Sequence, residues 1–167
     1  MNQGLVNVDC GSHTMRMKEC RVPIVEVQIL DERGRVPLKA SEDAAGLDLY
    51  ACTDDDDVFM LPGTTTSIGT GIAVSIPRGY FGAVFARSGI ALRKGLRPAN
   101  CVGVIDADYR GELIVPLHND TDKSQVIHLG ERIAQLVILP CPTVEVRTVE
   151  NLGNTQRGTG GFGSTGA

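Results

Sequence analysis

From Val22 onward, short apolar runs alternate with turn-forming residues, and this rhythm restricts the chain to few architectures. Many runs are rich in β-branched residues and alternate apolar with polar positions, which is the period of a half-buried strand. Gly, Pro, Asn and Asp separate the runs. We expect strands over residues 22–30, 46–51, 66–74, 80–85, 112–117, 125–129, 132–139 and 143–149. Short strands at regular spacing predict an all-β sandwich, jelly roll or barrel.

One segment has helical character. Ser88–Gly95 could form about two turns of helix, with Ser88 as N-cap and Gly95 as the C-terminal stop. A total of 20 glycines and an aromatic fraction of 4% favour tight turns over further helices. The last segment, 151–167, has almost no apolar residues, so we expect a flexible arm that a ligand or partner orders.

Length and charge exclude several classes of protein. The 167 residues fit one domain, and a hydrophobic fraction of 42% excludes disorder of the whole chain. A net charge of −4 argues against a protein that coats nucleic acid or an anionic membrane. The five scattered cysteines form no CxxC pair, and the N-terminus lacks a signal-peptide pattern, so we expect a cytoplasmic protein. Residues 1–20 read as a disordered leader or N-terminal extension.

Asn100–Glu112 is the segment richest in chemical groups, and Asp106 and Asp108 flank one alanine within it. In a strand the two carboxylates would share a face, whereas in a hairpin turn they would diverge and Tyr109 would cap the bend. Two interpretations stay open. The aspartates serve a turn, or one is a general base and the other orients or pairs with a charge.

Two further segments could bind anions. Ala86–Gly89 combines a helix N-terminus, a hydroxyl and an arginine, although an ordinary N-cap would look the same. Arg157–Gly166 contains GxGxxG but lacks the flanking strand and helix of a dinucleotide fold. It is either a disordered tail or a strip that wraps a polyphosphate and stacks on a base. Together these parts predict a nucleotide polyphosphate as ligand.

Five segments, read in order, closely resemble the motifs of the trimeric dUTPase family. They are residues 45–49, 86–89, 103–111, 130–135 and 157–166, within a resemblance that covers about residues 22–167. The resemblance implies an all-β, jelly-roll-like β-barrel subunit with one short helix, in which residues 21–150 form the domain and 151–167 a Gly-rich arm. It also implies a homotrimer whose active sites lie between subunits, with each arm closing a neighbouring site.

The resemblance implies hydrolysis of dUTP to dUMP and diphosphate, which keeps uracil out of DNA and supplies dUMP for thymidylate synthesis. Asp106 is then the base that activates water for attack on the α-phosphorus. Mg²⁺ is the implied cofactor, bound to the phosphates, with Asp48 near it through water. The implied partners are dUTP and further copies of the chain, with no nucleic acid or membrane.

The family pattern also assigns substrate contacts by position. The residues assigned to the phosphates are Arg87, Ser88, Gly89 and Gln135. The arm contributes Arg157, Phe162, Gly163, Ser164 and Thr165, and Phe162 is assigned to stack on uracil. Asn100 helps to fix the base, Tyr109 packs under the sugar, and the base pocket is lined by Val104, Ile105 and Ile114. The alternatives are a dCTP deaminase, with or without diphosphatase activity, and a non-catalytic dUTP- or protein-binding module.

Overall fold

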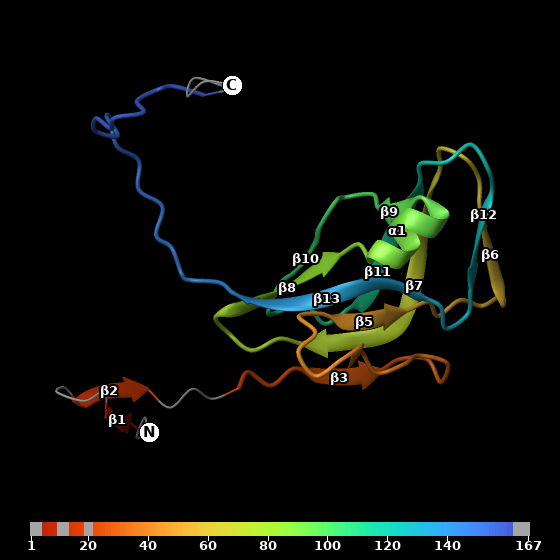
Figure 1. Cartoon of the computed structure of the whole chain (residues 1–167), viewed down its shortest axis with the longest axis horizontal. Coiled ribbons are helices and arrows are strands. Elements are labelled where there is room, and N and C mark those ends of the chain that lie inside the picture. The colour runs from red at the N-terminus through yellow and green to blue at the C-terminus, as the bar shows by residue number, and fades with distance from the viewer. Residues whose placement is uncertain (1–4, 10–13, 19–21, 162–167) are drawn as a thin grey trace.

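Two antiparallel sheets and one short helix make up the body of the molecule (Figure 1). The computed structural model describes residues 5–9, 14–18 and 22–161. The first sheet has the order β10-β8-β13-β5-β4, with bounds Gly103–Ile105, Tyr80–Phe85, Arg132–Pro140, Leu47–Tyr50 and Leu38–Lys39. The second has the order β3-β7-β11-β9, with bounds Glu26–Ile29, Thr65–Ser75, Glu112–Asn119 and Leu96–Pro98. A ribbon of β6 (Asp57–Met60) and β12 (Gln125–His128) extends beside them.

The core lies between the sheets and takes side chains from both. On β11 the alternation is strict, because Leu113, Val115 and Leu117 are buried while Ile114 is half exposed. The three buried residues of β11 join one cluster with side chains of β5, β8 and β13 from the other sheet. Burying each large aliphatic side chain contributes about 1.5–3 kcal/mol, so this cluster is what holds the two sheets together.

The all-β prediction is confirmed, but the expected barrel is not closed. The strand ladders among residues 22–161 leave the five-stranded and four-stranded sheets without a shared strand. The subunit is therefore a two-layer sandwich. Among the described residues, no helix has the length and apolar character needed to cross a membrane.

The predicted helix is present as α1, Ser88–Lys94. Gly95 ends it in the left-handed conformation, with φ 60° and ψ 31°, and donates its backbone N–H to the carbonyl of Ala91 at 3.0 Å. The expectation that Ser88 is the N-cap is wrong. Ser88 already belongs to the helix, so the cap position falls on Arg87, which has an extended backbone and makes no side-chain capping bond.

The predicted strand 143–149 is absent. The alternating sequence favours a strand, but the segment pairs with no described strand and its valines are exposed, with Val146 at 91%. A strand needs a partner for its backbone groups, and β13 ends at Pro140, just before a second proline, Pro142. The remaining predicted strands are present, and 80–85 matches β8 at both ends.

Both chain ends leave the sandwich (Figure 1). The N-terminal extension, expected to be disordered, contains two antiparallel strands, β1 (Leu5–Asp9) and β2 (Thr14–Lys18), which pair with each other. Period-two alternation in both segments gives this pairing its local cause. At the other end, the Cys141 N–H donates to the carbonyl of Gly79 at 2.7 Å, and the described chain beyond it is exposed except at Gly160.

Candidate active site

The segment that joins β10 to β11 bridges the two sheets. β10 pairs with β8, with Gly103 opposite Val84, whereas β11 pairs with β7. Residues 100–114 therefore form an arch whose two arms belong to different sheets. Glycines allow β10 to lie against β8, because a Cβ at Gly103 would lie 3.1 Å from the Val84 Cβ. Because β10 pairs with β8 and β11 pairs with β7, a space is left between these two arms of the arch.

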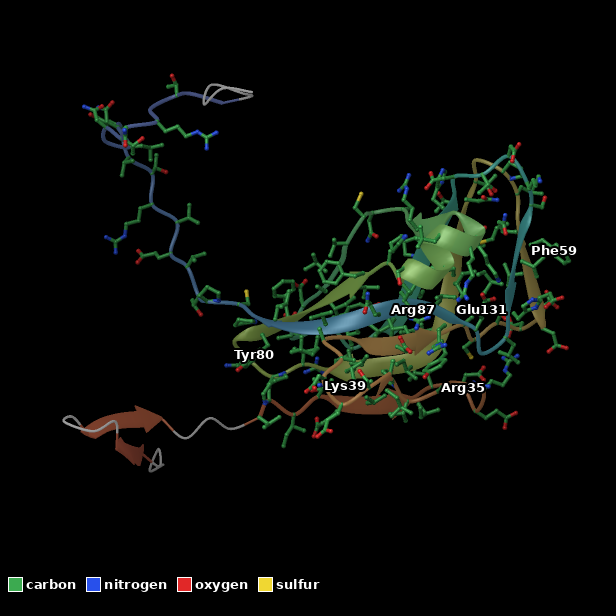
Figure 2. All side chains as sticks on the ribbon, in the orientation of Figure 1. Arg35, Lys39, Phe59, Tyr80, Arg87 and Glu131 are labelled. Carbon is green, nitrogen blue, oxygen red and sulfur yellow. The ribbon has the colours of Figure 1, made fainter. Side chains whose placement is uncertain are left out.

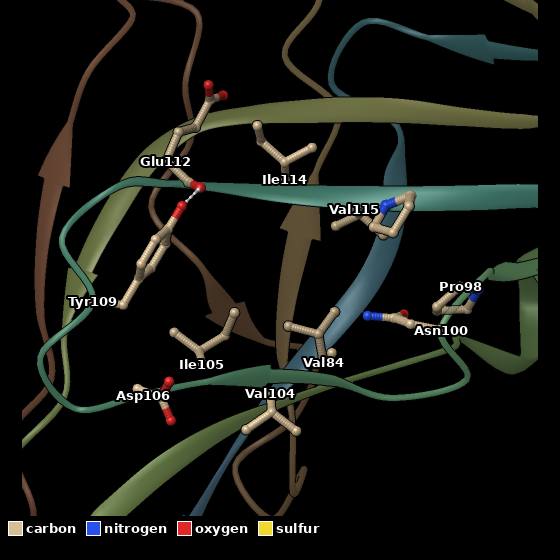
Figure 3. A pocket seen from close by; sticks show the side chains of 12 residues that line it. Val84, Pro98, Asn100, Val104, Ile105, Asp106, Tyr109, Glu112, Ile114 and Val115 are labelled. Carbon is tan, nitrogen blue, oxygen red and sulfur yellow. Dashed lines mark hydrogen bonds between the residues drawn. The ribbon is translucent and has the colours of Figure 1, made fainter.

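A pocket of about 340 Å³ occupies this space (Figure 3). That volume is within the usual range of small-molecule sites, about 300–1,000 Å³. Six of the residues predicted for base catalysis and nucleoside recognition line it, namely Asn100, Val104, Ile105, Asp106, Tyr109 and Ile114. In Figure 3 Ile105 points between the arms, whereas Val104 and Asp106 lie at the rim. Val84, Pro98, Glu112, Val115 and Pro116 line the pocket without having been predicted.

The turn of the arch separates the two aspartates. The Tyr109 N–H donates to the Asp106 carbonyl at 3.1 Å, which closes a turn over these residues. Asp106 lines the pocket and Asp108 does not. The Arg110 guanidinium donates to the carbonyls of Ala107 and Tyr109 at 2.8 and 2.7 Å, so the turn is fixed from its outer side. The two carboxylates therefore diverge, and only Asp106 is placed to meet a ligand in this pocket.

Asn100 is presented to the pocket by a tight turn. Cys101 has φ 62°, the one positive value found for a non-glycine residue among the described residues. The N–H groups of Cys101 and Val102 donate to the carbonyls of Pro98 and Asn100 at 3.1 and 2.7 Å. Left-handed backbone at a cysteine costs free energy, so it marks a place where the fold imposes the chain direction. The result is that the Asn100 side chain lies among the lining residues (Figure 3).

The residues predicted to bind the phosphates and Mg²⁺ lie around Asp48, whose side chain is nearly buried. The Arg87 Nε lies 2.7 Å from Asp48 Oδ1, and an Arg132 nitrogen lies 3.2 Å from Oδ2. Gln135 is opposite Asp48 on the neighbouring strand and donates to the Ala86 carbonyl at 2.9 Å. Arg132 was not singled out from the sequence, although it lies inside the fourth motif.

Two small pockets share Arg87 as a lining residue. Figure 2 labels Arg87 near the middle of the sandwich. One, of about 140 Å³, is lined by Asp48, Ser88 and Gln135 together with Arg87. The other, of about 120 Å³, brings Gly89 beside Arg87, Arg93, Lys94 and Arg132. Two guanidinium groups share one buried carboxylate here, so the cluster retains a net positive charge and can attract phosphate groups.

The same geometry bears on Mg²⁺. The guanidinium groups of Arg87 and Arg132 already contact both oxygens of Asp48. No group of three or more His, Cys, Asp or Glu side chains in the described part of the chain could hold a metal ion. Mg²⁺ is commonly bound by substrate phosphates and waters with few protein ligands. These residues therefore fit Mg²⁺ that is held mainly by a polyphosphate and not by a cage of protein ligands.

Within the described part of the chain, the predicted residues remain in separate groups. The nucleoside pocket and the Asp48 pocket share no lining residue. Arg157 is exposed in the arm, where its Nε donates to the Gly160 carbonyl at 2.8 Å. The other predicted arm residues, Phe162, Gly163, Ser164 and Thr165, lie outside the described residues.

Comparison with known proteins gives this arrangement a context. Residues 32–166 match the dUTPase family. The chain is 48% identical to the deoxyuridine 5'-triphosphate nucleotidohydrolase of Syntrophotalea carbinolica over 142 residues, which are 85% of this chain and 96% of that protein. The chain belongs to the dUTPase family.

Solved structures of dUTPases share its fold. A mutant dUTPase of Staphylococcus bacteriophage 80alpha with dUpNHpp superposes with a TM-score of 0.78 at 32% identity, covering 86% of this chain and 99% of the phage chain. A mutant dUTPase from phage phi11 of S. aureus, described with a coordinated structural Mg(II) ion, has a TM-score of 0.71 at 28% identity and covers 78% and 99% of the respective chains. The sandwich, the arch and the helix therefore form a dUTPase subunit.

Proposed function

We propose that this dUTPase hydrolyses dUTP to dUMP and diphosphate. The observation that carries the proposal is the arch pocket, where Asn100, Asp106 and Tyr109 line one cavity in a chain of this family. The phage 80alpha dUTPase with dUpNHpp supports a deoxyuridine triphosphate as ligand. Family membership makes the chain a dUTP diphosphatase, and the arch pocket supplies groups suited to the nucleoside and the attacking water.

In the proposed reaction the Asp106 carboxylate takes a proton from a water molecule. The water oxygen forms a bond to the α-phosphorus, and the bond from that phosphorus to the bridging oxygen breaks. The electron pair leaves with diphosphate, and the water proton remains on Asp106 until it is released to solvent. General base catalysis of this kind contributes about 10²–10⁴-fold.

Positioning and charge supply the larger part of the rate in phosphoryl transfer. Arg87, Ser88 and Gly89 are proposed to bind phosphate groups at the positive cluster, with Gln135 beside them. Mg²⁺, which Asp48 is proposed to hold through water, would supply positive charge that offsets the charge on the leaving diphosphate. The arm is proposed to add Arg157, Ser164 and Thr165 at the terminal phosphate.

Base and sugar selection follow from the shape of the arch. The backbone of β10 and the Asn100 amide are proposed to hydrogen-bond the uracil edge, between Ile105 and Ile114. Cytosine presents the wrong donor pattern there, and the thymine methyl group would clash with so close a backbone. The Tyr109 ring is proposed to pack under the sugar and leave no room for a 2′-hydroxyl, and Phe162 to stack on uracil.

A homotrimer would unite the separated groups. Within one chain the arch pocket and the Asp48 pocket have no residue in common, and the arm extends away from the sandwich (Figure 1). Val104 and Ile114 at the arch are 63% and 51% exposed, which leaves apolar surface for another subunit to cover. We expect light scattering to give three times the chain mass of 17.8 kDa, and a monomeric mass would contradict the assembly.

The experiment that tests the activity is Mg²⁺-dependent release of pyrophosphate from dUTP, dCTP, dTTP and UTP, with ammonia followed in the dCTP sample. Release from dUTP alone is expected. Ammonia from dCTP would instead indicate the deaminase branch of the fold. No release from any substrate would indicate a binding role, which the dUpNHpp analogue could then test directly.

A further inference from the structure

The Tyr109 ring is fixed by the two residues that follow Arg110 in the chain. We propose that Gly111 and Glu112 are positioning residues that set the place of this ring and thereby determine the selection of deoxyribose over ribose. The proposal rests on the proposed function, in which the ring packs under the sugar. It adds two residues that the family motif roles do not assign, and both are proposed to act through Tyr109.

Gly111 is required for space. Its φ lies outside the left-handed region, so its backbone conformation is open to any residue. A Cβ built on Gly111 would nevertheless lie 2.6 Å from Tyr109 Cζ and 3.0 Å from Cε2, and would also overlap the hydroxyl. All three nearest atoms belong to Tyr109. A methyl group at this position must therefore displace the tyrosine ring before it displaces anything else.

Glu112 holds the ring at its other end. The Tyr109 hydroxyl donates to the Glu112 carbonyl at 3.0 Å (Figure 3). The Glu112 side chain is itself anchored, because Oε1 accepts the backbone N–H groups of Thr70 and Gly71 on β7 at 3.0 and 2.8 Å. These N–H groups lie where the β7–β11 register shifts, between Glu112 and Ile114, so the carboxylate caps a bulge. Hydrogen bonds to a carboxylate are stronger than neutral ones.

These contacts connect the ring to the four-stranded sheet. Asp106, at the start of the same turn, directly follows β10 of the five-stranded sheet. The ring thus lies at a fixed distance from the β10 side of the pocket, where the sugar would lie. Glu112 and Tyr109 both line that pocket. A small displacement of the ring would open the volume that a 2′-hydroxyl needs, and exclusion of one hydroxyl is a matter of such fit.

A double-mutant cycle with Gly111→Ala and Tyr109→Ala tests the role of Gly111. The readout is the ratio of kcat/KM for dUTP to kcat/KM for UTP, which a purely structural loss would leave unchanged. We expect Gly111→Ala to lower this ratio about tenfold or more in the wild-type background. In the Tyr109→Ala background it should change nothing further, because the atoms it would meet are gone. An unchanged ratio in the first case, or an equal fall in both, would overturn the proposal.

Tyr109→Phe tests the hydroxyl contact without altering the backbone, and it decides the matter if Gly111→Ala fails to fold. Losing this bond should lower the dUTP/UTP ratio about five- to tenfold. Glu112→Ala should act in the same direction, since the anchored carbonyl is released. Tyr80→Phe, on β8 outside the pocket, is the matched control and should leave the ratio unchanged. An active wild type whose ratio resists both substitutions rejects this inference alone, and a wild type inactive on dUTP rejects the proposed function and the inference with it.

Discussion

At the scale of single residues, the two aspartates of the arch differ in what they face. Asp106 lines the nucleoside pocket, and Asp108, two positions later, does not. The sequence -Asp-Ala-Asp- left open whether both would share a face, because a strand and a turn predict opposite outcomes. The turn from Asp106 to Tyr109 decides it.

Asp106→Asn should lower kcat for dUTP hydrolysis by about 10²–10⁴-fold, since the amide keeps the shape of the carboxylate but cannot take a proton from water. Binding of dUpNHpp, measured by calorimetry, should stay close to that of the wild type. Asp108→Asn is the matched control and should retain normal turnover. If the Asp106 variant turns over at the normal rate, another group is the base.

Cys52 offers a prediction on thiol reactivity. Burial raises the pKa of its thiol, and the negative charge of Asp31 adds to the effect. Because a raised pKa means less thiolate at a given pH, Cys52 should be alkylated more slowly at pH 8 than the exposed Cys101 and Cys141. The alkylation rate of Cys52 should rise as the pH is raised above 8, because more of its thiol is then ionised. Timed iodoacetamide labelling with peptide mass spectrometry measures this, and Cys52 reacting first would contradict it.

At the scale of elements, patterns that depend on near neighbours predicted structure well, and patterns that depend on distant partners did not. Residues 80–85 form β8, and Gly95 ends α1, because alternation and a left-handed cap are local properties. Residues 143–149 alternate equally well and form no strand, since no described edge pairs with them. The arch also depends on a distant partner, because β10 pairs with β8, which lies outside the segment 100–114.

The candidate site shows the same limit. Each motif located its own residues, and six of those predicted for the nucleoside line one pocket. The sequence did not predict a role for Glu112 or Arg132, because each acts through a partner that is remote in sequence. Glu112 contacts the backbone of β7, and Arg132 contacts Asp48. Their positions next to or inside the third and fourth motifs were the available signal.

Two glycines with positive φ, Gly63 between β6 and β7 and Gly95 at the end of α1, separate the cost of backbone strain from the cost of steric overlap. Gly63→Ala places a side chain at φ 68° where no atom lies within 4 Å, so it should cost about 1–2 kcal/mol of unfolding free energy from backbone strain alone. Gly95→Ala adds overlap with the Thr121 methyl group and should cost about 2–4 kcal/mol. Urea unfolding of both variants gives the difference. Equal losses would show that Thr121 moves away freely.

At the scale of the whole molecule, we expect the arm to contribute nothing to the stability of the sandwich. Deleting residues 157–167 should leave the melting temperature and the oligomer mass unchanged, because beyond Cys141 the described arm bonds only within itself. Hydrolysis of dUTP should fall sharply, since the proposed closing residues are lost. Arg147→Ala, which breaks an exposed ion pair in the segment before the arm, is the control for activity. Loss of the oligomer on truncation would instead make the arm a structural element.

The separation of the arch pocket from the Asp48 pocket also has a genetic consequence. In the proposed trimer each site combines residues of different subunits. A mutation therefore damages only the part of a site that the mutant chain supplies. Two alleles, one damaged at Asp106 and one at Arg87, would each be null alone. Co-expressed, they would assemble mixed trimers in which some sites draw both intact halves from different parents. This enzyme should therefore show complementation between alleles of a single gene.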